Sequence, residues 1–254
     1  MKILADAVWS SRFLTVRKTS RLINKLASLL PKSQRKELSH RVHVMSRLKS
    51  SNEQIYYNID SIQQALHRQC PISFTYSEWV ISRDGGHLRY HRQKRKNGSR
   101  YEAFPFELIW DDENYYLVAR DWASGDHRHY RVDRMQEIEV LTKDDPAGRA
   151  AAARFDPSVY SRSVFDMYNG RERTCHILFH QDLLGAMIDR FGEDMIVQMS
   201  DQTEWYRTVQ YIRVSERFFG WVLAFGGKVQ LEGPEDVKQD LKDFLRLLAD
   251  AYII

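Results

Sequence analysis

The sequence predicts an α+β protein with a helical front part, a small β-barrel and a second mixed domain. Between Ile72 and Leu141, short segments of alternating apolar and polar residues are separated by tight turns, which is typical of a small antiparallel β domain. From residue 174 onward, strand and helix patterns follow one another in the order βαββαβ, with one more helix at the end. The length of 254 residues suits two domains of about 100 residues each.

Residues 1–70 are expected to form a helical linker region and not a complete domain, because apolar residues are few. Leucine and isoleucine recur at helical spacing over Thr15–Leu30. Ser33 is a suitable N-cap for a short second helix, whereas Arg41–Tyr57 has no clear period. Asp60 is the expected N-cap of a third helix, which a proline at position 71 ends.

Residues 71–142 are predicted to form a small antiparallel barrel, because closing many short strands removes exposed edges. Ile72–Tyr76 alternates apolar and polar residues and opens the region. Asp111–Asn114 is a polar turn that joins two β segments in a hairpin. Further strands are expected at 88–96 and 99–104 around the Asn97-Gly98 turn. The arms of the hairpin are expected at 101–110, which overlaps the strand before it, and at 115–120, and a last strand is expected at 128–141.

After a linker at 143–173, residues 174–254 are predicted to form a ferredoxin-like domain that supports dimerisation. The expected strands are 174–179, 195–199, 205–214 and 228–231, and the expected helices are 182–191, 215–225 and 234–252. The middle helix carries more apolar residues than one face can use, among them Phe218, Phe219, Trp221 and Phe225. Burial under the sheet is one interpretation, and a dimer interface is the other.

Charge and composition favour a cytoplasmic protein with a polyanionic partner. No run approaches the roughly 20 apolar residues of a membrane helix, and the two cysteines lack metal-type spacing. The net charge is only +4, but basic residues concentrate between Arg83 and Arg100. A solvated basic loop is the alternative interpretation. The candidate nucleic-acid-binding residues in this run are Arg92, Lys94, Arg95 and Lys96.

One ordered set of residues in the barrel region points to a known family. Tyr115-Tyr116-Leu117 is preceded by Pro105 and Leu108 and followed by Arg131, Asp133 and Arg134. This order and spacing resemble the WYL family of bacterial ligand-sensing regulators, which is named for a Trp-Tyr-Leu triplet. Tyr115 replaces the tryptophan, so an aromatic ring with a polar tip is kept. The resemblance covers about Ile59 to Tyr252.

The resemblance implies an Sm- or SH3-like barrel and a C-terminal extension domain. A homodimer is expected from the apolar surplus of the 215–225 helix and from the symmetric assembly usual for regulators. The resemblance also implies that a winged helix-turn-helix normally precedes this point. Duplex DNA would therefore be contacted only through an absent or upstream DNA-binding domain.

Strand parity sorts the candidate ligand-binding residues. Tyr116, Val118 and Arg120 share one face of their strand, and alternate residues from His127 to Asp133 share one face of the next. Arginines in a small barrel either pair with carboxylates such as Asp121 and Asp133 or meet an anion. In the resembled family, aromatic and basic barrel residues form the ligand pocket. The candidates are Tyr76, Arg100, Tyr116, Arg120, His129, Arg131 and Arg134.

The sequence favours a binding protein over an enzyme. His127 and His129 lack a third metal ligand at supporting spacing, and no nucleophile motif is present, so no metal, cofactor or catalytic residue is expected. We therefore expect the ligand-sensing and dimerisation portion of a bacterial WYL-type transcriptional regulator, with a nucleotide-like or single-stranded nucleic-acid ligand. The alternative is a stand-alone nucleic-acid-binding module without transcriptional output.

Overall fold

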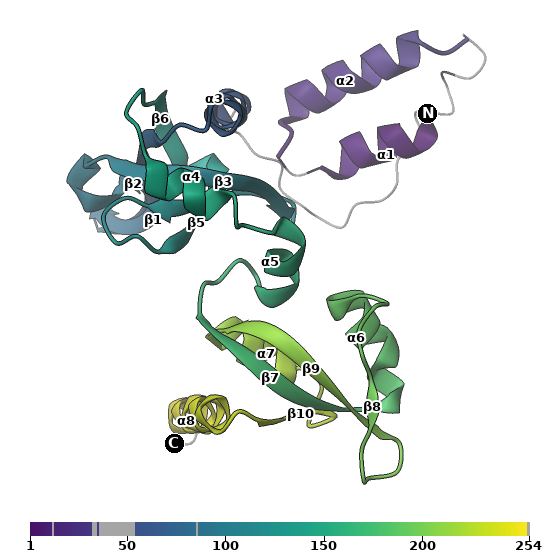
Figure 1. The fold of residues 1–254 in the computed structure, drawn as a ribbon. Helices are drawn as coiled ribbons and strands as arrows, with labels where there is room; N and C mark the ends of the chain where they lie inside the picture. The colour runs from purple at the N-terminus through teal and green to yellow at the C-terminus, as the bar shows by residue number, and fades with distance from the viewer. Residues whose placement is uncertain (12, 32–34, 36–53, 85, 253–254) are drawn as a thin grey trace. The chain divides into compact units, whose positions relative to one another are not determined.

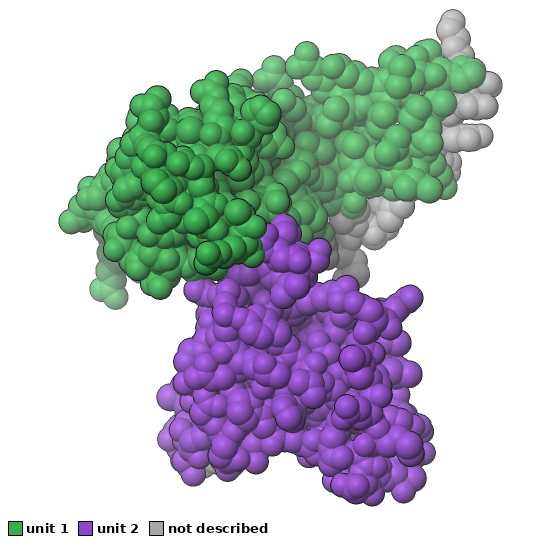
Figure 2. All heavy atoms as spheres, viewed as in Figure 1, with its two compact units in different colours: residues 1–154 green, residues 155–254 purple. Residues whose placement is uncertain are grey.

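The chain divides into two compact units, Met1–Arg154 and Phe155–Ile254 (Figure 2). The structure is a computed structural model that describes residues 1–11, 13–31, 35, 54–84 and 86–252. Front helices, an antiparallel sheet and a second group of strands and helices follow one another along the chain (Figure 1), so the predicted α+β class is confirmed. The helix predicted from Ser33 falls almost entirely outside the described residues.

The first unit begins with two helices that pack on each other and continues into the barrel. Thr15 is the N-cap of the second helix, where its hydroxyl accepts a hydrogen bond from the Lys18 N–H. The elements of the unit are α1 Lys2–Ser10, α2 Val16–Ser28, α3 Gln54–Arg68, β1 Ile72–Asp84, β2 His87–Lys94, η2 Arg95–Gly98, β3 Tyr101–Asp111, β4 Asn114–Asp121, β5 His127–Arg131, η3 Val132–Arg134, β6 Met135–Val140 and α4 Pro146–Ala152.

The long strand β1 organises the barrel because its two halves pair with different strands. Its first half lies between β3 and β6, and its second half pairs only with β2 as an exposed ribbon. The sheet runs in the order β2-β1-β3-β4-β5, with β6 on β1. The β3–β4 hairpin pairs Asp111 with Asn114, and its loop residues Asp112 and Glu113 both have positive φ, as a primed two-residue turn requires.

Helix α3 closes one side of the barrel core. Ile55, Ile62 and Ala65 recur at helical spacing and are buried in the cluster formed by β1, β3, β4 and β6. The prediction that Asp60 caps this helix is wrong, because α3 already begins at Gln54. Asn58 lies on the apolar face and hides the helical period in the sequence.

The predicted continuous strand 128–141 is also wrong. A single 3₁₀ turn, η3, separates β5 from β6 and carries Asp133 and Arg134. Strand parity therefore does not extend past Arg131, and Asp133 can turn back toward it. The turn also redirects the chain so that β6 pairs with β1.

The second unit has the strand order β10-β7-β9-β8, which is that of a ferredoxin-like sheet. Gly192 ends α6 with a φ of 98°, and Ser215 caps α7 by accepting from the Phe218 N–H. The elements of the unit are α5 Pro157–Ser163, β7 Arg171–His180, η4 Gln181–Leu183, α6 Leu184–Phe191, β8 Gln198–Met199, β9 Trp205–Val214, α7 Glu216–Leu223, β10 Val229–Gly233 and α8 Glu235–Tyr252.

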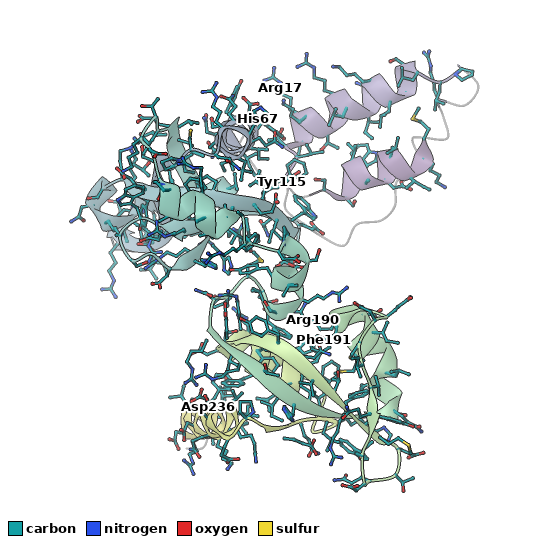
Figure 3. The ribbon with its side chains drawn as sticks, viewed as in Figure 1. Arg17, His67, Tyr115, Arg190, Phe191 and Asp236 are labelled. Atoms are coloured by element: carbon teal, nitrogen blue, oxygen red, sulfur yellow. The ribbon has the colours of Figure 1, made fainter. Side chains whose placement is uncertain are left out.

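The aromatic residues of α7 pack mainly inside their own unit. Phe218 and Phe219 are buried, and Trp221 and Phe225 pack against the same core. Trp221 also contacts Phe191 at the end of α6, with ring centroids 5.6 Å apart (Phe191 is labelled in Figure 3). Burial under the sheet therefore accounts for most of the apolar surplus seen in the sequence of this helix.

Candidate ligand-binding site

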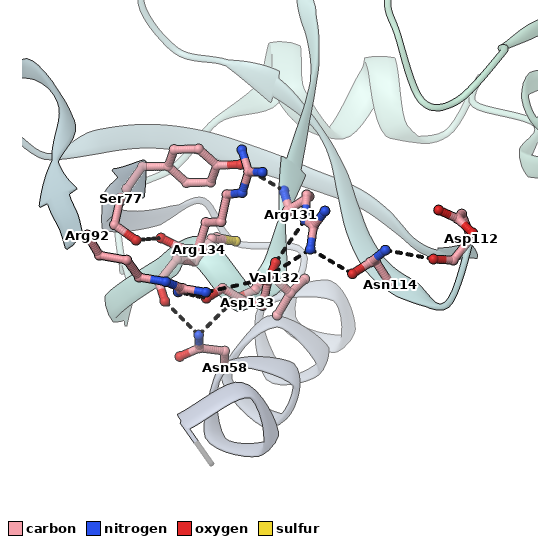
Figure 4. A network of polar contacts seen from close by, with 11 residues as sticks. Asn58, Ser77, Arg92, Asp112, Asn114, Arg131, Val132, Asp133 and Arg134 are labelled. Carbon is pink, nitrogen blue, oxygen red and sulfur yellow. Dashed lines mark hydrogen bonds and ion pairs between the residues drawn. The ribbon is translucent and has the colours of Figure 1, made fainter. Parts of the chain in front are cut away.

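The strongest polar network near the predicted pocket surrounds η3. We call Tyr76, Arg92, Arg131, Asp133 and Arg134 the turn cluster (Figure 4). These residues come from the β1–β2 ribbon and from the continuous segment formed by the end of β5 and η3, so two parts of the chain that are distant in sequence meet at one place. Three guanidinium groups and one carboxylate make the cluster positively charged.

Arg131 and Asp133 form a two-point ion pair across the turn. Arg131 Nε donates to Asp133 Oδ1 at 3.0 Å, and Nη2 donates to Oδ2 at 3.1 Å. Nη2 also donates to Asn114 Oδ1 at 2.7 Å. Partial burial alone would lower the pKa of Arg131, but its hydrogen bonds to the Asp133 carboxylate outweigh that effect and hold the pKa above its usual value. Arg131 is therefore a fixed cation aimed by its neighbours.

Of the other two arginines, Arg92 also contacts Asp133, whereas Arg134 has no ion pair within the described residues. Arg92 Nη1 donates to the Asp133 carbonyl at 2.7 Å, and Nη2 lies 3.6 Å from Asp133 Oδ2. Within the described part of the chain, the Arg134 guanidinium has no ion pair, although it is close enough to lower the pKa of Tyr76. Arg134 is thus the cation of the cluster that is most available to an anion.

Two tyrosines complete the surroundings of Arg131. The Arg131 N–H donates to the Tyr76 hydroxyl at 3.1 Å, and burial raises the pKa of Tyr76. Tyr116 pairs with Arg131 in the β4–β5 register, and burial raises its pKa too. Asp111 and Asp112 of the hairpin turn add to that rise, so the positive cluster has an acidic neighbour. Tyr116 is only half-buried, which leaves ring surface for stacking.

The turn is tied to helix α3 by one buried side chain. Asn58 Nδ2 donates to the Val132 carbonyl at 3.0 Å and to the Met135 carbonyl at 2.7 Å. Asn58 is only 2% exposed. Asn58 was not predicted from the sequence to be part of the site. Its spacing from Ile55 and Ile62, which places all three on one face of the helix, is the pattern that predicts its burial. The cluster is therefore coupled mechanically to α3.

Three predicted ligand residues lie apart from the turn cluster or contact other groups. Arg100 donates to the Ser73 side chain and carbonyl and to the Glu137 carbonyl, at 2.7–3.1 Å. Arg120 lies 3.5 Å from the buried Asp145 carboxylate, and about 13 Å along β4 from the position that pairs with Arg131. His129 faces Val118 and is half-buried. The turn cluster therefore unites Tyr76, Arg131 and Arg134, with Tyr116 at its side.

The predicted nucleic-acid-binding run is largely paired within the chain. Lys94 Nζ lies 2.7 Å from Glu137 Oε1, and Arg95 Nε lies 3.0 Å from Glu78 Oε2. Lys96 Nζ lies 4.2 Å from the centre of the Tyr101 ring. Arg92, the fourth member, belongs to the turn cluster. These pairs are partly exposed, so their charge is only weakly neutralised.

The buried carboxylate of Asp121 holds the β4–β5 loop through hydrogen bonds that, within the described residues, include no member of the turn cluster. Asp121 Oδ2 accepts from the Tyr130 hydroxyl at 2.9 Å, and Oδ1 accepts from the N–H groups of Ala123 and Ser124. Burial alone would raise the pKa of Asp121, but the hydrogen bonds from Ser124 and Tyr130 hold it below its usual value. Tyr130 is thereby fixed in the aromatic core beside Tyr76.

The WYL domain model matches residues 80–140, from the second half of β1 to the end of β6. The match contains β2 to β6, and all of the turn cluster except Tyr76. Residues 80–140 of the chain thus form a WYL domain. The search among curated proteins found no match.

Two solved structures are similar to the chain over nearly its whole length. The proteasome accessory factor B/C (PafBC) of Arthrobacter aurescens is 18% identical with a TM-score of 0.35, and the match covers 98% of this chain and 33% of that one. A CRISPR Cas-related protein is 16% identical with a TM-score of 0.43, and the match covers 94% of this chain and 59% of that one. The WYL-domain chain thus spans about a third and about three-fifths of these two proteins.

Two further features of the described residues bear on the kind of site. Helices in these ranges are too short or too polar to cross a membrane. No three His, Cys, Asp or Glu side chains in the same ranges are grouped closely enough to hold a metal ion. The arrangement of the turn cluster suits binding of an anion by guanidinium groups beside aromatic rings.

Proposed function

We propose that this WYL-domain protein is the effector-sensing part of a bacterial transcriptional regulator, and that the turn cluster binds a nucleotide-like anion or a single-stranded nucleic acid. The observation that carries the proposal is the surplus of guanidinium groups around Asp133, with Arg134 unpaired among the described residues. Arginine offers a two-point contact to phosphate, and the exposed part of Tyr116 offers a face for a base.

The proposed output runs from the turn to the front helices. A ligand that draws Arg134 or Arg131 toward it shifts η3, and the two hydrogen bonds from Asn58 pass that shift to α3. The role is binding and not catalysis. Duplex DNA is contacted through a DNA-binding domain outside the described helices, and the protein acts in the cytoplasm.

The test uses the full chain and fluorescence anisotropy with labelled single-stranded oligonucleotides and cyclic dinucleotides. Arg134→Gln removes a charge-assisted contact and should weaken binding about 10- to 150-fold. Tyr116→Leu removes stacking and should weaken it about 5- to 150-fold. Affinity should also fall steeply as salt rises.

A matched control is Arg128→Gln. Arg128 is on the same strand as Arg131 but on the opposite face, where its Nε lies 3.6 Å from Asp121. This variant should bind nearly as tightly as the unchanged protein. Binding that ignores Arg134→Gln, Tyr116→Leu and salt would exclude the turn cluster as the ligand site.

A stand-alone nucleic-acid-binding module is the second candidate, and the exposed β1–β2 ribbon favours it. Trp79 and Tyr90 are 56% and 78% exposed with ring centroids 5.8 Å apart, and Arg92 lies 5.2 Å over Trp79. Such rings can stack on successive bases. Loss of oligonucleotide binding in Trp79→Ala and Tyr90→Ala, together with intact binding in Arg134→Gln, would favour this candidate.

We also propose that the protein forms a homodimer through its second unit. The aromatic residues of α7 pack into the core of their own unit, so the exposed apolar residues of β8 and β9 are the better interface candidates. Met199 is 82% exposed, Val209 47% and Tyr211 44%. Light scattering of the full chain should give twice the mass of 30.1 kDa, and Val209→Asp should halve it. A full chain that is monomeric at micromolar concentration would contradict the dimer.

A further inference from the structure

A pocket in the second unit lies outside the ligand site discussed above. It has a volume of about 460 Å³ and is formed by the turn after α5 together with α7 and α8. That volume lies in the range of pockets that hold small molecules. Its apolar walls are Phe165, Tyr168, Trp221 and Phe244. Since four aromatic side chains line one cavity, the pocket can offer ring surfaces to a ligand.

The polar groups of the pocket leave one negative charge in excess. Asp166, Glu216 and Arg217 lie at its edge, and Arg217 Nε is 3.8 Å from Asp166 Oδ2. Within the described residues, Glu216 has no ion pair. Aromatic faces are electron-rich and attract cations, most strongly where carboxylates lie close by. The walls and the edge of the pocket therefore favour the same sign of ligand charge.

Arginines of the same unit already lie over two of these rings, so Trp221 and Phe244 are the walls left for a ligand. Arg190 Cζ lies 3.9 Å from the centre of the Phe165 ring, and Arg217 Cζ lies 4.8 Å from that of Tyr168. The backbone of this wall forms a tight turn that pairs Phe165 with Tyr168, and its two middle residues, Asp166 and Met167, both adopt positive φ. Aspartate tolerates this conformation, as Asp112 does in the β3–β4 hairpin, whereas methionine adopts it rarely.

We propose that this pocket binds an alkylammonium group, with the charge beside Glu216 and Asp166 and the alkyl chain against Trp221 and Phe244. The charge could belong to a free aliphatic amine or to a lysine side chain of a partner protein. Either source presents the same chemistry to the pocket.

A glycine in the pocket wall provides a specific test. Gly220 is exposed on α7, and a Cβ built on it has no other atom within 4 Å. Gly220→Leu therefore fills part of the cavity without a clash in the core. Gly185 on α6 is also exposed with open space around its Cβ, and it does not line the pocket. Gly185→Leu is thus a matched control for the change in helix propensity.

The experiment is ligand-observed NMR on the full chain with three probes of equal length, pentylamine, pentanol and pentanoate. Pentylammonium should bind tightest and pentanoate weakest. Gly220→Leu should weaken pentylammonium about tenfold or more by steric exclusion, and Glu216→Gln about 2- to 5-fold. Gly185→Leu should leave its affinity unchanged.

A second set of probes separates the two sources of the charge. Tighter binding of Nα-acetyl-lysine methylamide than of pentylamine would assign the pocket to a protein segment, and equal or weaker binding would assign it to free amines. The proposal is overturned if pentanol or pentanoate binds as tightly as pentylammonium. It is also overturned if Gly220→Leu binds pentylammonium as well as Gly185→Leu does.

Discussion

Arginines in the second unit mostly face carboxylates of their own, whereas those around η3 share one. Arg162 Nη1 lies 2.9 Å from Asp194, and Arg207 Nε lies 2.7 Å from Glu232 on β10. In the turn cluster, Arg92 and Arg131 both face Asp133, and Arg134 has no ion pair within the described residues. Charges that are paired locally join structural elements, and a surplus of one sign is suited to attracting a ligand of the other.

The difference also shows what must hold each region together. In the second unit the ion pairs bridge strands and helices directly. In the turn cluster the arginines repel one another, so neutral hydrogen bonds must fix the backbone around η3. Asn58 donates two of them, to the Val132 and Met135 carbonyls, and the Tyr76 hydroxyl accepts the third from the Arg131 N–H. Five substitutions test this contrast between the two regions, with effects that decrease from Asn58→Ala to Arg207→Gln.

Asn58→Ala should have the largest effect. It leaves the carbonyls of Val132 and Met135 without their donor in a buried place, which should lower the free energy of unfolding by about 2–4 kcal/mol. Urea denaturation measures this change. Gln64→Ala, on an exposed face of the same helix, should change it by less than about 0.5 kcal/mol. A loss below about 1 kcal/mol in Asn58→Ala would mean that the amide does not hold the turn.

Asp121→Asn probes a barrel carboxylate that is held mainly by neutral donors. The free energy of unfolding at neutral pH should fall by about 1–3 kcal/mol, because Tyr130 and the turn N–H groups lose a charged acceptor. The folded state depresses the pKa of Asp121, so its stabilisation is present above the unfolded value near about 3.9 and is lost as pH falls through the lower folded value. The difference between variant and unchanged protein should therefore shrink below about pH 4. Denaturation curves at several pH values between neutrality and strong acid would reveal a constant difference if this were incorrect.

Arg213→Gln removes the most buried arginine of the second unit. The side chain is 9% exposed, pairs with Glu172, and donates to Asn169 Oδ1 at 2.9 Å. Its loss should cost about 2 kcal/mol of unfolding free energy, as for hydrogen bonds to a charged group. Thermal unfolding in low and high salt should give a similar loss, since the Arg213 guanidinium is buried and its bond to Asn169 does not depend on salt, although the Glu172 side chain is 46% exposed. A loss that vanished in high salt would class the pair with surface contacts.

Asp133→Asn should act mainly on ligand affinity. It removes the carboxylate that neutralises Arg131 and Arg92 and keeps the shape of the side chain. Binding of a single-stranded oligonucleotide should tighten about 5- to 10-fold, which corresponds to about 1 kcal/mol. Anisotropy titrations of Asp133→Asn and of Asp126→Asn, a change in the exposed β4–β5 loop, give the comparison. Unchanged or weaker binding in Asp133→Asn alone would show that Asp133 does not compete with the ligand.

Arg207→Gln should have the smallest effect. Arg207 is 33% exposed on the side chain and pairs with Glu232 and Asp201 on the surface of the sheet. The free energy of unfolding should fall by about 0.2–1 kcal/mol, and this loss should shrink further as salt is added. Differential scanning calorimetry in two salt concentrations measures it. An effect as large as that of Arg213→Gln would contradict the link between burial and strength of the pairs.

Local patterns in the sequence predicted much of the fold. The hairpin turn after Asp111, the Ser215 cap and the Gly192 stop all depend on neighbouring residues, and all appear in the structure. The start of α3 was placed too late because Asn58 interrupts its apolar period, and the break after Arg131 was missed because η3 is only three residues long. Both features depend on segments far apart in the chain, because Asn58 bonds to the Val132 and Met135 carbonyls and the break after Arg131 lets β6 pair with β1.

The candidate site was predicted less completely than the fold. Strand parity sorted Tyr116 with Arg120 on its strand and Arg131 with His129 on the next, because parity needs only the alternation along each strand. That Tyr116 pairs with Arg131 follows from the register of β4 and β5, which parity does not give. Arg92 was assigned to a separate basic surface, since its approach to Asp133 depends on how the β1–β2 ribbon bends over η3. Whether Arg134 pairs with Asp133 could not be settled from adjacency. The structure gives that carboxylate to Arg131 instead.

The two hydrogen bonds from Asn58 also set where a foldable fragment of this protein can begin. The family match begins at Val80, but the first half of β1 and the helix α3 both precede it. A fragment that starts at the match would expose the Val132 and Met135 carbonyls, and it would leave β6 without the part of β1 that it pairs with. Boundaries drawn from sequence similarity are therefore too narrow here. An independently folding sensor domain has to include Gln54–Arg68, even though that helix carries none of the family's signature residues.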